Sequence, residues 1–410
     1  MFEELQNLSY RFLDIKNQKY RRYFIQNTQL SQRLSMLIGQ RGIGKTTTLI
    51  QYLLDFAKQD RFDPSILYIQ ADHFVMGNTS LYEITDSFHK LGGKLIAFDE
   101  IHKYENWSLE LKSIYDTFPD IKIIASGSSA LEIQKGSHDL SRRAIIHHLH
   151  GLSFREYLEL HYDLSLQPYA LDEILKNHIR ISNDIISAIQ DSGKKILSHF
   201  MDYLNYGFYP FYREVENLPI FQVLLEQNMH TTIESDLVAI YAHLTGNSLK
   251  KIKQLLSFIA QSVPFIPNWK KIKSIVDISD DRTLKTYFKY LEDAELIQTI
   301  SKATEKLNKL EISEKIYLNN SNQMFALSFN NCNIGTVRET FFLNTLSALY
   351  DISLPTQGGF LVNNQFLFEI GGRKKGFQQL KDLKNAFLAC DDIETGIGNK
   401  IPLWLFGFLY

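Results

Sequence analysis

The chain has 410 residues and a formal net charge of −2, from 44 lysines and arginines against 46 aspartates and glutamates. This length allows several domains, each with its own hydrophobic core, and the balanced charge excludes a global basic surface, so any nucleic-acid contact must be local. The two cysteines are too few for a disulfide framework or a zinc site, which indicates a reducing compartment.

The first motif in the chain is a glycine-rich loop between a predicted strand and a predicted helix. The stretch LIGQRGIGKTTT has the spacing G-x-x-x-x-G-K-[ST], which is typical of loops that bind phosphates through backbone N–H groups. RLSMLI at residues 33–38 predicts the strand, and TTLIQYLLDFAK at residues 47–58 has the apolar spacing of a helix. The alternative is a glycine turn before an ordinary helix. The order of strand, loop and helix favours the phosphate loop.

Each position of this loop has a chemical task. Glycines let the backbone approach phosphate oxygens, Lys45 is expected to reach the β- and γ-phosphates, and the Thr46 hydroxyl is expected to hold Mg²⁺. The positive end of the following helix adds to the attraction for anions. The predicted nucleotide contacts are Gly39, Gln40, Arg41, Gly42, Ile43, Gly44, Lys45, Thr46 and Thr47.

A second predicted strand, KLIAFDE at residues 94–100, ends in two adjacent carboxylates. Asp99 is expected to hold Mg²⁺ together with Thr46, and Glu100 to polarise the attacking water. This pair favours an ATPase whose own glutamate activates water over a GTPase-type switch or a small-molecule kinase. The chain also has no Asn-Lys-x-Asp motif that would read guanine. The expected ligands are therefore ATP and Mg²⁺.

A helix is predicted at residues 106–119, followed by a buried strand within DIKIIASGSSALEI at residues 120–133. Ser126 or Ser128 at the end of that strand is a candidate for contact with the γ-phosphate or the attacking water; the alternative is that these serines cap the turn. Three histidines follow in HHLH. They alternate along a predicted last strand and have no Cys or acidic partner at ligand spacing, so we do not assign them a metal.

Five stretches in this order, GQRGIGKTT, LIAFDEIHKYENW, IIASGSSALEI, SRRAIIHHLHGLSFREYL and YLNYGFYPFY, resemble the bacterial and archaeal AAA-type ATPases. In these proteins an ATPase domain precedes a winged helix and a C-terminal nuclease-like domain. The resemblance spans nearly the whole chain and implies an α/β P-loop fold with a parallel sheet at residues 1–155. It further implies a helical lid at 156–247, a winged helix at 248–327 and a degenerate nuclease-like domain at 328–410.

The family usually has a Gly-Arg pair before the segment LSFREY. The corresponding stretch here is LSRR, so Arg142 replaces the glycine and Arg143 keeps the arginine. The resemblance implies that Arg143 neutralises charge on the γ-phosphate, in its own chain or in a neighbouring one. The alternative is that Arg143 pairs with a surface carboxylate.

Three helical patterns followed by KIYLNN have the order of a helix-turn-helix with a wing. In the third pattern, apolar residues recur at i, i+3, i+4 and i+7 and predict a buried face: Leu284, Tyr287, Phe288 and Leu291. The opposite face carries three candidates for DNA phosphate contact: Arg282, Lys285 and Lys289. The alternative is a solvated face that contacts protein, where Asp280 and Asp281 partly cancel the charge.

The last region, RETFFLNTL…GGFLVNNQFLFEIGGRKK, resembles a restriction-endonuclease core. In such a core a helix glutamate, a hairpin aspartate and a strand Glu-x-Lys hold Mg²⁺ and position water. Glu339 and Glu369 fit this outline, but Gly359 stands at the aspartate position and Gly371 at the lysine position. With these groups missing, we expect a degenerate fold that binds a partner and does not cut DNA.

Lys374 and Lys375 come after the predicted end of that strand, and the apolar C-terminus IPLWLFGFLY predicts a buried strand. This stretch is too short to span a bilayer, and the N-terminus MFEELQNLSYRFLDIK is unlike a signal peptide. We therefore expect a soluble, cytoplasmic protein.

The sequence as a whole predicts an ATPase that couples its nucleotide state to the presentation of the winged helix and C-terminal domain to a protein partner of unknown identity. An oligomer and weak nucleic-acid binding are both compatible with this architecture. The alternative is a DNA-binding regulatory module that uses ATP as a slow conformational switch, and an active nuclease is less favoured. Whether DNA or an added partner stimulates hydrolysis distinguishes the two main hypotheses, an ATPase that acts on a protein partner and a DNA-binding module.

Overall fold

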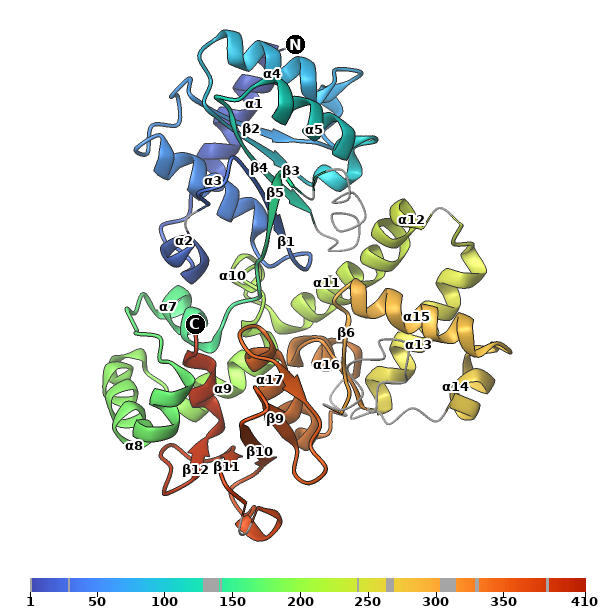
Figure 1. The fold of residues 1–410 in the computed structure, drawn as a ribbon. Helices are drawn as coiled ribbons and strands as arrows, with labels where there is room; N and C mark the ends of the chain where they lie inside the picture. Colours follow the sequence, from blue (N-terminus) through green and yellow to red (C-terminus); the bar gives the residue numbers. More distant parts are fainter. Residues whose placement is uncertain are drawn as a thin grey trace. The chain divides into compact units, whose positions relative to one another are not determined.

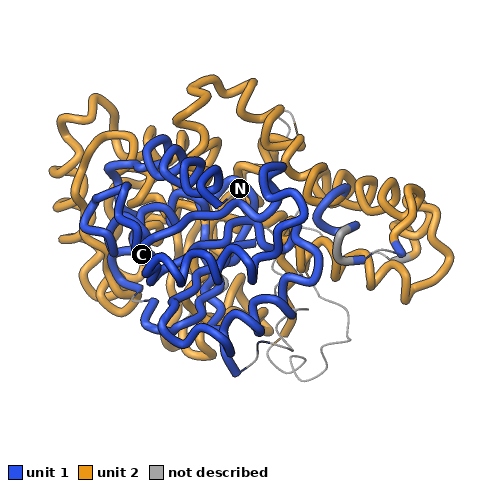
Figure 2. Tube along the Cα trace, turned by 90° about the horizontal axis from the view of Figure 1, so that it is seen from above, with its two compact units in different colours: residues 1–150, 234–243 blue, residues 151–233, 244–410 orange. Residues whose placement is uncertain are grey.

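The structure, a computed structural model, describes residues 2–28, 30–127, 140, 142–241, 243–262, 269–302, 315–328, 332–380 and 383–410 (Figure 1). The chain forms two compact units. The first consists of Met1–His150 and Glu234–His243, and the second of Gly151–Ile233 and Leu244–Tyr410 (Figure 2). Within the described ranges no helix has the length and apolarity needed to cross a membrane.

The first unit contains a five-stranded parallel sheet with helices on both sides (Figure 1). Its strands, in the order β2-β3-β4-β1-β5, are β1 Leu34–Ile38, β2 Ile66–Gln70, β3 Leu95–Asp99, β4 Lys122–Gly127 and β5 Ala144–His148. Strands β1 and β3 are buried along their whole length, as expected for parallel strands covered on both faces. The strands predicted at residues 33–38 and 94–100 are therefore confirmed as β1 and β3.

Helices of the first unit connect and cover these strands. Among the described residues of Met1–His150 they are α1 Phe2–Ile15, α2 Tyr23–Asn27, α3 Lys45–Phe56, α4 Leu81–Lys90 and α5 Trp107–Thr117, with the short 3₁₀ helices η1 Phe74–Met76 and η2 Ile101–Lys103. Helix α3 packs on β2, β3 and β4, and α4 packs against α5. Because all strands run parallel, the segments after β1 and β3 meet at the carboxyl edge of the sheet, where β4 also ends.

The second unit begins with helical elements: α7 Phe154–Tyr162, α8 Leu171–Ala188, η3 Gln190–Ser192, α9 Ile196–Asp202, η4 Tyr203–Gly207, α10 Tyr212–Val215 and α11 Leu218–Thr231. The chain then passes through η5 Thr232–Asp236 and α12 Leu237–Ile240. Helix α7 starts at a capping box, in which the Ser153 side chain accepts from the Glu156 N–H and the Glu156 carboxylate accepts from the Ser153 N–H. This explains why LSFREY begins a helix.

Three further helices and a hairpin follow: α13 Gly246–Ser262, α14 Trp269–Val276, α15 Asp281–Asp293, β6 Ile297–Ile300 and β7 Lys315–Leu318, the two strands pairing antiparallel. Helix α15 starts after Asp280, whose side chain accepts from the Thr283 N–H. Its predicted apolar face is buried. Three helices before a hairpin have the order predicted for a helix-turn-helix with a wing.

The C-terminal part consists of α16 Ser321–Ser328, α17 Ile334–Ser347, β8 Ile352–Ser353, β9 Phe360–Val362, β10 Phe366–Gly371, η7 Phe377–Gln379, β11 Ala386–Cys390, β12 Lys400–Pro402 and η8 Leu403–Phe408. Strands β8, β9 and β10 pair antiparallel, and β10, β11 and β12 pair parallel. Helix α17 packs on β10 (Figure 1). Phe342 of α17 lies 5.0 Å from Phe368 and 5.5 Å from Phe360 between ring centroids, which places an aromatic core under the sheet.

The prediction of a C-terminal strand is wrong for most of that stretch. Only Lys400–Pro402 is a strand, and Leu403–Phe408 forms the 3₁₀ helix η8, although every residue of the stretch is buried. Its aromatic rings point to different neighbours: Phe406 packs on Phe342, and Phe408 packs on Phe154. A short helix serves these contacts because its side chains project all round its axis, whereas those of a strand occupy two faces.

Apart from Glu234–His243, the residues predicted as lid, winged helix and tail belong to the second compact unit. Asn322 of α16, for example, donates to the carbonyl oxygens of Tyr203 and Leu204 at 3.0 and 2.9 Å. The Ser153 hydroxyl and the Arg155 guanidinium both donate to the carbonyl oxygen of Tyr410, at 2.8 and 3.0 Å. The division of residues 156–410 into three domains therefore stays a proposal.

Candidate functional site

The loop between β1 and α3 has backbone conformations that favour glycine. Gly39, Gly42 and Gly44 have φ values of 152°, 84° and 95°. A Cβ atom on Gly39 would lie 2.3 Å from the carbonyl oxygen of Leu149 and 2.6 Å from Ile43 Cδ1, so no other residue fits there without movement. The predicted nucleotide residues 39–47 all lie in this loop or in the first turn of α3.

Lys45 is the first residue of α3, and its side chain turns back over the loop. Its ammonium donates to the carbonyl oxygens of Gly39 at 2.9 Å and Gln40 at 2.7 Å, and the residue is only 5% exposed. The buried side chain of Arg22 also supports the loop, donating to the carbonyl oxygens of Ile43 and His150. A buried cation at a helix N-terminus favours the binding of anions. No sequence motif predicted this role for Arg22.

The loop meets the acidic end of β3 at Asp99. The Thr46 hydroxyl donates to Asp99 Oδ2 at 2.6 Å, and the Tyr68 hydroxyl of β2 donates to the same oxygen at 2.7 Å. The Ser126 hydroxyl donates to the other oxygen, Oδ1. Burial, and then the charge of Asp99, raise the pKa of Tyr68 far above its ordinary value, so its hydroxyl stays a donor. Three hydroxyls thus hold one buried carboxylate.

These residues fit a magnesium ion. The Thr46 hydroxyl and the Asp99 carboxylate are hard oxygen donors from two different elements, held together by a hydrogen bond. Mg²⁺ is usually bound by one or two protein oxygens together with water and substrate phosphates. The predicted pair of metal-binding residues therefore lies together beside the phosphate loop.

Glu100 follows Asp99 in a left-handed conformation, with φ of 52°. Its Oε2 lies 3.3 Å from Lys103 Nζ and 3.8 Å from His102 Nε2, and Lys103 Nζ also lies 2.6 Å from Asp72 Oδ2. Burial alone would lower the pKa of Lys103, but its hydrogen bond with Asp72 and the charge of Glu100 raise it above the ordinary value. An anchored ammonium therefore holds the predicted catalytic carboxylate.

Ser126 lies between the two acidic residues. Besides donating to Asp99, its oxygen accepts from the Glu100 N–H at 3.2 Å. This contact differs from both roles expected for it, which were contact with phosphate or water and capping of the turn. Here Ser126 ties the end of β4 to the end of β3. Ser128 lies outside the described residues.

Arg41, in the middle of the loop, contacts a residue that no motif predicted. Its Nη2 lies 3.5 Å from Oδ1 of Asp236, whose side chain is 1% exposed. His102 Nε2 lies 4.0 Å from the same oxygen. Burial lowers the pKa of His102 to about 4, despite the opposing effect of Asp236, so the ring is neutral near pH 7. The site thus includes a carboxylate from the segment Glu234–His243.

Arg143 lies at the opposite edge of the sheet from the phosphate loop. It precedes β5, which pairs with β1 in the register Leu34↔Ala144 to Ile38↔His148, whereas the loop follows the carboxyl end of β1. Five residues of strand separate the two edges by about 16 Å. Arg143 instead pairs with Asp116, with Nε–Oδ1 and Nη2–Oδ2 distances of 2.9 Å. A role at the γ-phosphate stays a prediction and requires a neighbouring chain.

The three basic candidates on α15, Arg282, Lys285 and Lys289, are all exposed. Of the two acidic residues expected to cancel their charge, Asp280 caps the helix and Asp281 pairs with Lys273 at 2.8 Å. Since these three basic residues lie at i, i+3 and i+7 of α15, they share one side of the helix.

Near the predicted nuclease motif, Glu369 Oε1 lies 2.8 Å from Lys375 Nζ. The Lys375 side chain folds back over Gly371, where an added Cβ would lie 2.6 Å from Lys375 Cβ. Gly359 is next to Glu369, and Glu339 accepts a hydrogen bond from the Tyr317 hydroxyl at 2.6 Å. Lys375 follows the strand as expected, but its pairing with Glu369 was not predicted.

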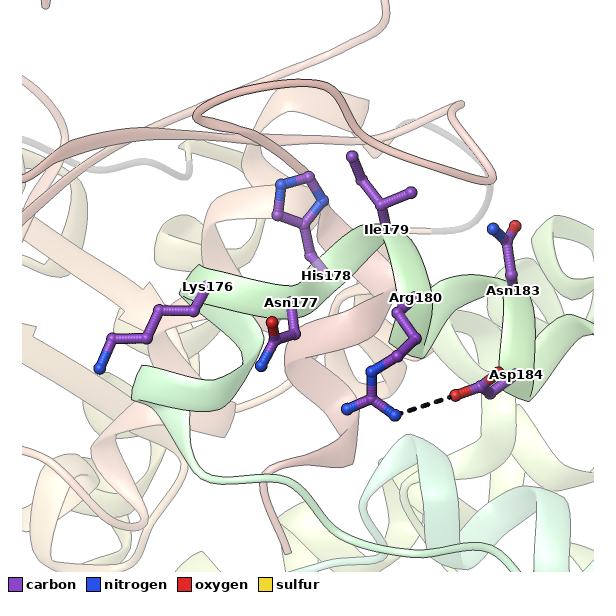
Figure 3. Close-up of a pocket in the computed structure, with 7 residues that line it drawn as sticks. All are labelled: Lys176, Asn177, His178, Ile179, Arg180, Asn183 and Asp184. Carbon is purple, nitrogen blue, oxygen red and sulfur yellow. Dashed lines mark hydrogen bonds and ion pairs between the residues drawn. The ribbon is translucent and has the colours of Figure 1, made fainter.

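A separate hollow of about 530 Å³ lies on α8 (Figure 3). All of its lining residues come from this helix, which is kinked at Asn177. Arg180 pairs with Asp184 at 3.3 Å and with Glu173 at 3.4 Å, and His178 Nε2 bonds to the Gly398 carbonyl at 2.9 Å. Since these polar groups are engaged with the protein itself, we assign the hollow no function.

Two family models match the chain. Residues 31–158 match the AAA domain family, and residues 197–328 match a domain family of unknown function, DUF8612. The first match contains β1 to β5, the phosphate loop and the acidic end of β3. It supports an AAA-type P-loop domain in this part of the chain.

Similarity extends over most of the chain to the uncharacterized protein MJ1637 of Methanocaldococcus jannaschii. The two are 27% identical over 317 residues, which cover 74% of this chain and 63% of that protein. Among solved structures, the Walker-type ATPase PABY2304 of Pyrococcus abyssi is similar at 14% identity and a TM-score of 0.35, covering 78% of this chain and 95% of that one. AMPPCP-bound DnaA from Aquifex aeolicus is similar at 15% identity and a TM-score of 0.26, covering 71% and 88%.

Proposed function

We propose that this chain binds ATP with Mg²⁺, hydrolyses it, and uses the nucleotide state to change how its second unit is presented to a protein partner. The observation that carries the proposal is the 2.6 Å hydrogen bond between Thr46 and Asp99, which joins the phosphate loop to the acidic strand end. The match of residues 31–158 to the AAA domain family supports it.

Different groups bind the phosphates and the metal ion. Backbone N–H groups of the loop and the Lys45 ammonium bind the phosphates, and the Thr46 hydroxyl and the Asp99 carboxylate, which are hydrogen-bonded to each other, hold Mg²⁺. When bound, the metal neutralises charge on the phosphates. Tyr68 and Ser126 keep the Asp99 carboxylate in position through their hydroxyls.

Glu100 acts as the base that takes a proton from the attacking water. Its backbone is held by Ser126, and its carboxylate is engaged with Lys103. The Glu100 carboxylate must therefore leave the Lys103 ammonium and contact the attacking water before it can act as a base. A partner that favours this change of contact stimulates hydrolysis.

Two variants test the proposal against the wild type. Lys45→Ala is expected to weaken ATP binding, measured with a fluorescent ATP analogue, because it removes the buried cation of the loop. Glu100→Gln is expected to bind ATP normally and to release phosphate more slowly by about 10²-fold or more, since general-base assistance has this size. The control is Asp184→Asn on α8, which also removes a carboxylate. Equal phosphate release by wild type and Glu100→Gln would remove the role of Glu100.

A second candidate function is a DNA-binding regulatory module, with ATP as a slow switch. The exposed basic face of α15 favours it, since Asp280 and Asp281 are engaged elsewhere. Three phosphate contacts predict a slope of log affinity against log salt of about −3. Fluorescence anisotropy measures this slope. Absence of binding at low salt, or binding unchanged when all three basic residues are replaced by alanine, would exclude α15 as a DNA reader.

For the C-terminal part we propose a degenerate nuclease-like domain that contacts the partner. Its helix, antiparallel strands β8 to β10 and parallel strand β11 follow the order of the predicted core. An aspartate in place of Gly359 would lie beside Glu369 and supply the second carboxylate, and glycine supplies none. Glu369 is instead paired with Lys375.

A further inference from the structure

The segment Glu234–His243 belongs by its contacts to the first unit, although the chain on both sides of it forms the second unit (Figure 2). Within this segment η5 ends at Asp236 and α12 begins at Leu237. The segment is therefore continuous with the second unit at both of its ends. The segment therefore links the two units through the backbone at both of its ends.

Asp236 places a carboxylate inside the candidate nucleotide site. Its side chain is 1% exposed, and its Oδ1 lies 3.5 Å from Arg41 Nη2 and 4.0 Å from His102 Nε2. A buried carboxylate is unfavourable unless a cation or hydrogen bonds compensate it, and the guanidinium of Arg41 is a cation at that distance. His102 in turn lies 3.8 Å from Glu100 Oε2. Asp236 thus adjoins the phosphate loop at Arg41, and His102 lies between it and the predicted catalytic base.

We infer that Asp236 competes with the phosphates of a bound nucleotide for Arg41, and so reports the phosphate state of the loop to the second unit. This inference rests on the proposed binding of ATP. Arg41 belongs to the loop that surrounds the phosphates, and a guanidinium binds phosphate in the same forked geometry as carboxylate. Because phosphates and Asp236 are both anions, they also repel each other. A triphosphate therefore weakens the Arg41–Asp236 pair, and the segment Glu234–His243 loses an anchor.

The first test is the affinity of Asp236→Asn for a non-hydrolysable ATP analogue. The variant removes a negative charge next to the phosphates and releases Arg41, so the analogue binds more tightly, by about fivefold for one like charge in a partly screened site. A residue with a purely structural role gives unchanged or weaker binding when it is replaced. Asp184→Asn is the matched control and leaves the affinity unchanged.

The second test is hydrogen exchange of the peptide that covers residues 232–241, measured by mass spectrometry on the full chain. In the wild type the analogue makes this peptide exchange faster than in the nucleotide-free protein. In Asp236→Asn the analogue makes no difference, and Asp236→Glu keeps the wild-type response. Arg41→Gln leaves the segment Glu234–His243 unchanged and is also expected to lose the increase in exchange. This variant provides the test if Asp236→Asn does not fold.

Two results overturn the inference: wild-type affinity for the analogue in Asp236→Asn, or a nucleotide-dependent exchange rate that persists in Arg41→Gln. Failure of the proposed function looks different. In that case the wild type itself does not bind the analogue, and Lys45→Ala does not differ from it.

Discussion

Replacing Tyr68 by phenylalanine tests whether the hydroxyls around Asp99 hold the metal-binding carboxylate. The Tyr68 hydroxyl donates to Asp99 Oδ2 at 2.7 Å, and both residues are 2% exposed. Phenylalanine keeps the ring and its packing, so the change removes one oxygen and leaves no large cavity. Thr46 and Ser126 remain as donors to the same carboxylate.

Two effects of this substitution can be estimated. A hydrogen bond to a carboxylate contributes about 1.5 to 3 kcal/mol. For a unit of this size that loss lowers the melting temperature by about 3 to 12 °C. Weakening the support of a metal-binding group typically reduces metal affinity by about tenfold or more. The Mg²⁺ concentration that gives half-maximal phosphate release is therefore expected to rise about tenfold in Tyr68→Phe, with the rate at saturating Mg²⁺ close to that of the wild type.

The assay is phosphate release across a Mg²⁺ titration, together with thermal unfolding. Tyr52→Phe is a matched control, because its hydroxyl donates to the Leu30 carbonyl at 3.2 Å and accepts from Lys122 at 2.7 Å, away from Asp99. The control is expected to leave the Mg²⁺ midpoint unchanged. If Tyr68→Phe has the wild-type midpoint and melting temperature, the hydroxyl does not support Asp99.

Arg143→Ala lowers the ATPase activity per chain only at protein concentrations at which chains associate, because Arg143 cannot reach its own phosphate loop. An activity per chain that does not change on dilution and is unaffected by the substitution contradicts this. Purified protein leaves plasmid and single-stranded DNA intact in Mg²⁺ or Mn²⁺, and nicking that disappears in Glu369→Ala would show a working nuclease centre. Deleting residues 403–410 lowers the soluble yield, measured after centrifugation, because these side chains are buried; an unchanged yield argues against a structural role.

Features that depend on neighbouring residues in the chain were predictable from the sequence. The phosphate loop is one of them, since its glycines, Lys45 and Thr46 act within one turn between β1 and α3. The buried parallel strands are another, because a strand covered on both faces reads as a continuous apolar run. Asp99 and Glu100 could be placed for the same reason, as the first polar residues after such a run.

Contacts set by the tertiary fold were not predictable in this way. From its place in an apolar run, Tyr68 is predicted to be an ordinary core residue. Its hydroxyl reaches Asp99 only because β2 and β3 pair in the register Gln70↔Asp99. Asp236 comes from a segment far along the chain and carries no motif. Lys375 had a weak signal: Gly371 leaves room beside Glu369, and a lysine shortly after the strand can fold into that room. Side-chain partners over such distances depend on packing that no local pattern encodes.

Lys103 decides how readily Glu100 can act as a base. Its ammonium is held by Asp72 at 2.6 Å and lies 3.3 Å from the Glu100 carboxylate, which it stabilises in the form engaged with the ammonium. For a partly exposed pair this stabilisation is about 1 kcal/mol, so Lys103→Met is expected to raise basal phosphate release about fivefold. The same substitution in Glu100→Gln is expected to change nothing, because the amide carries no charge for Lys103 to hold. Measuring phosphate release by the wild type, the two single variants and the double variant separates an effect through Glu100 from an effect that does not depend on Glu100. An equal change from Lys103→Met in both backgrounds would show that Lys103 acts on turnover by a route other than Glu100.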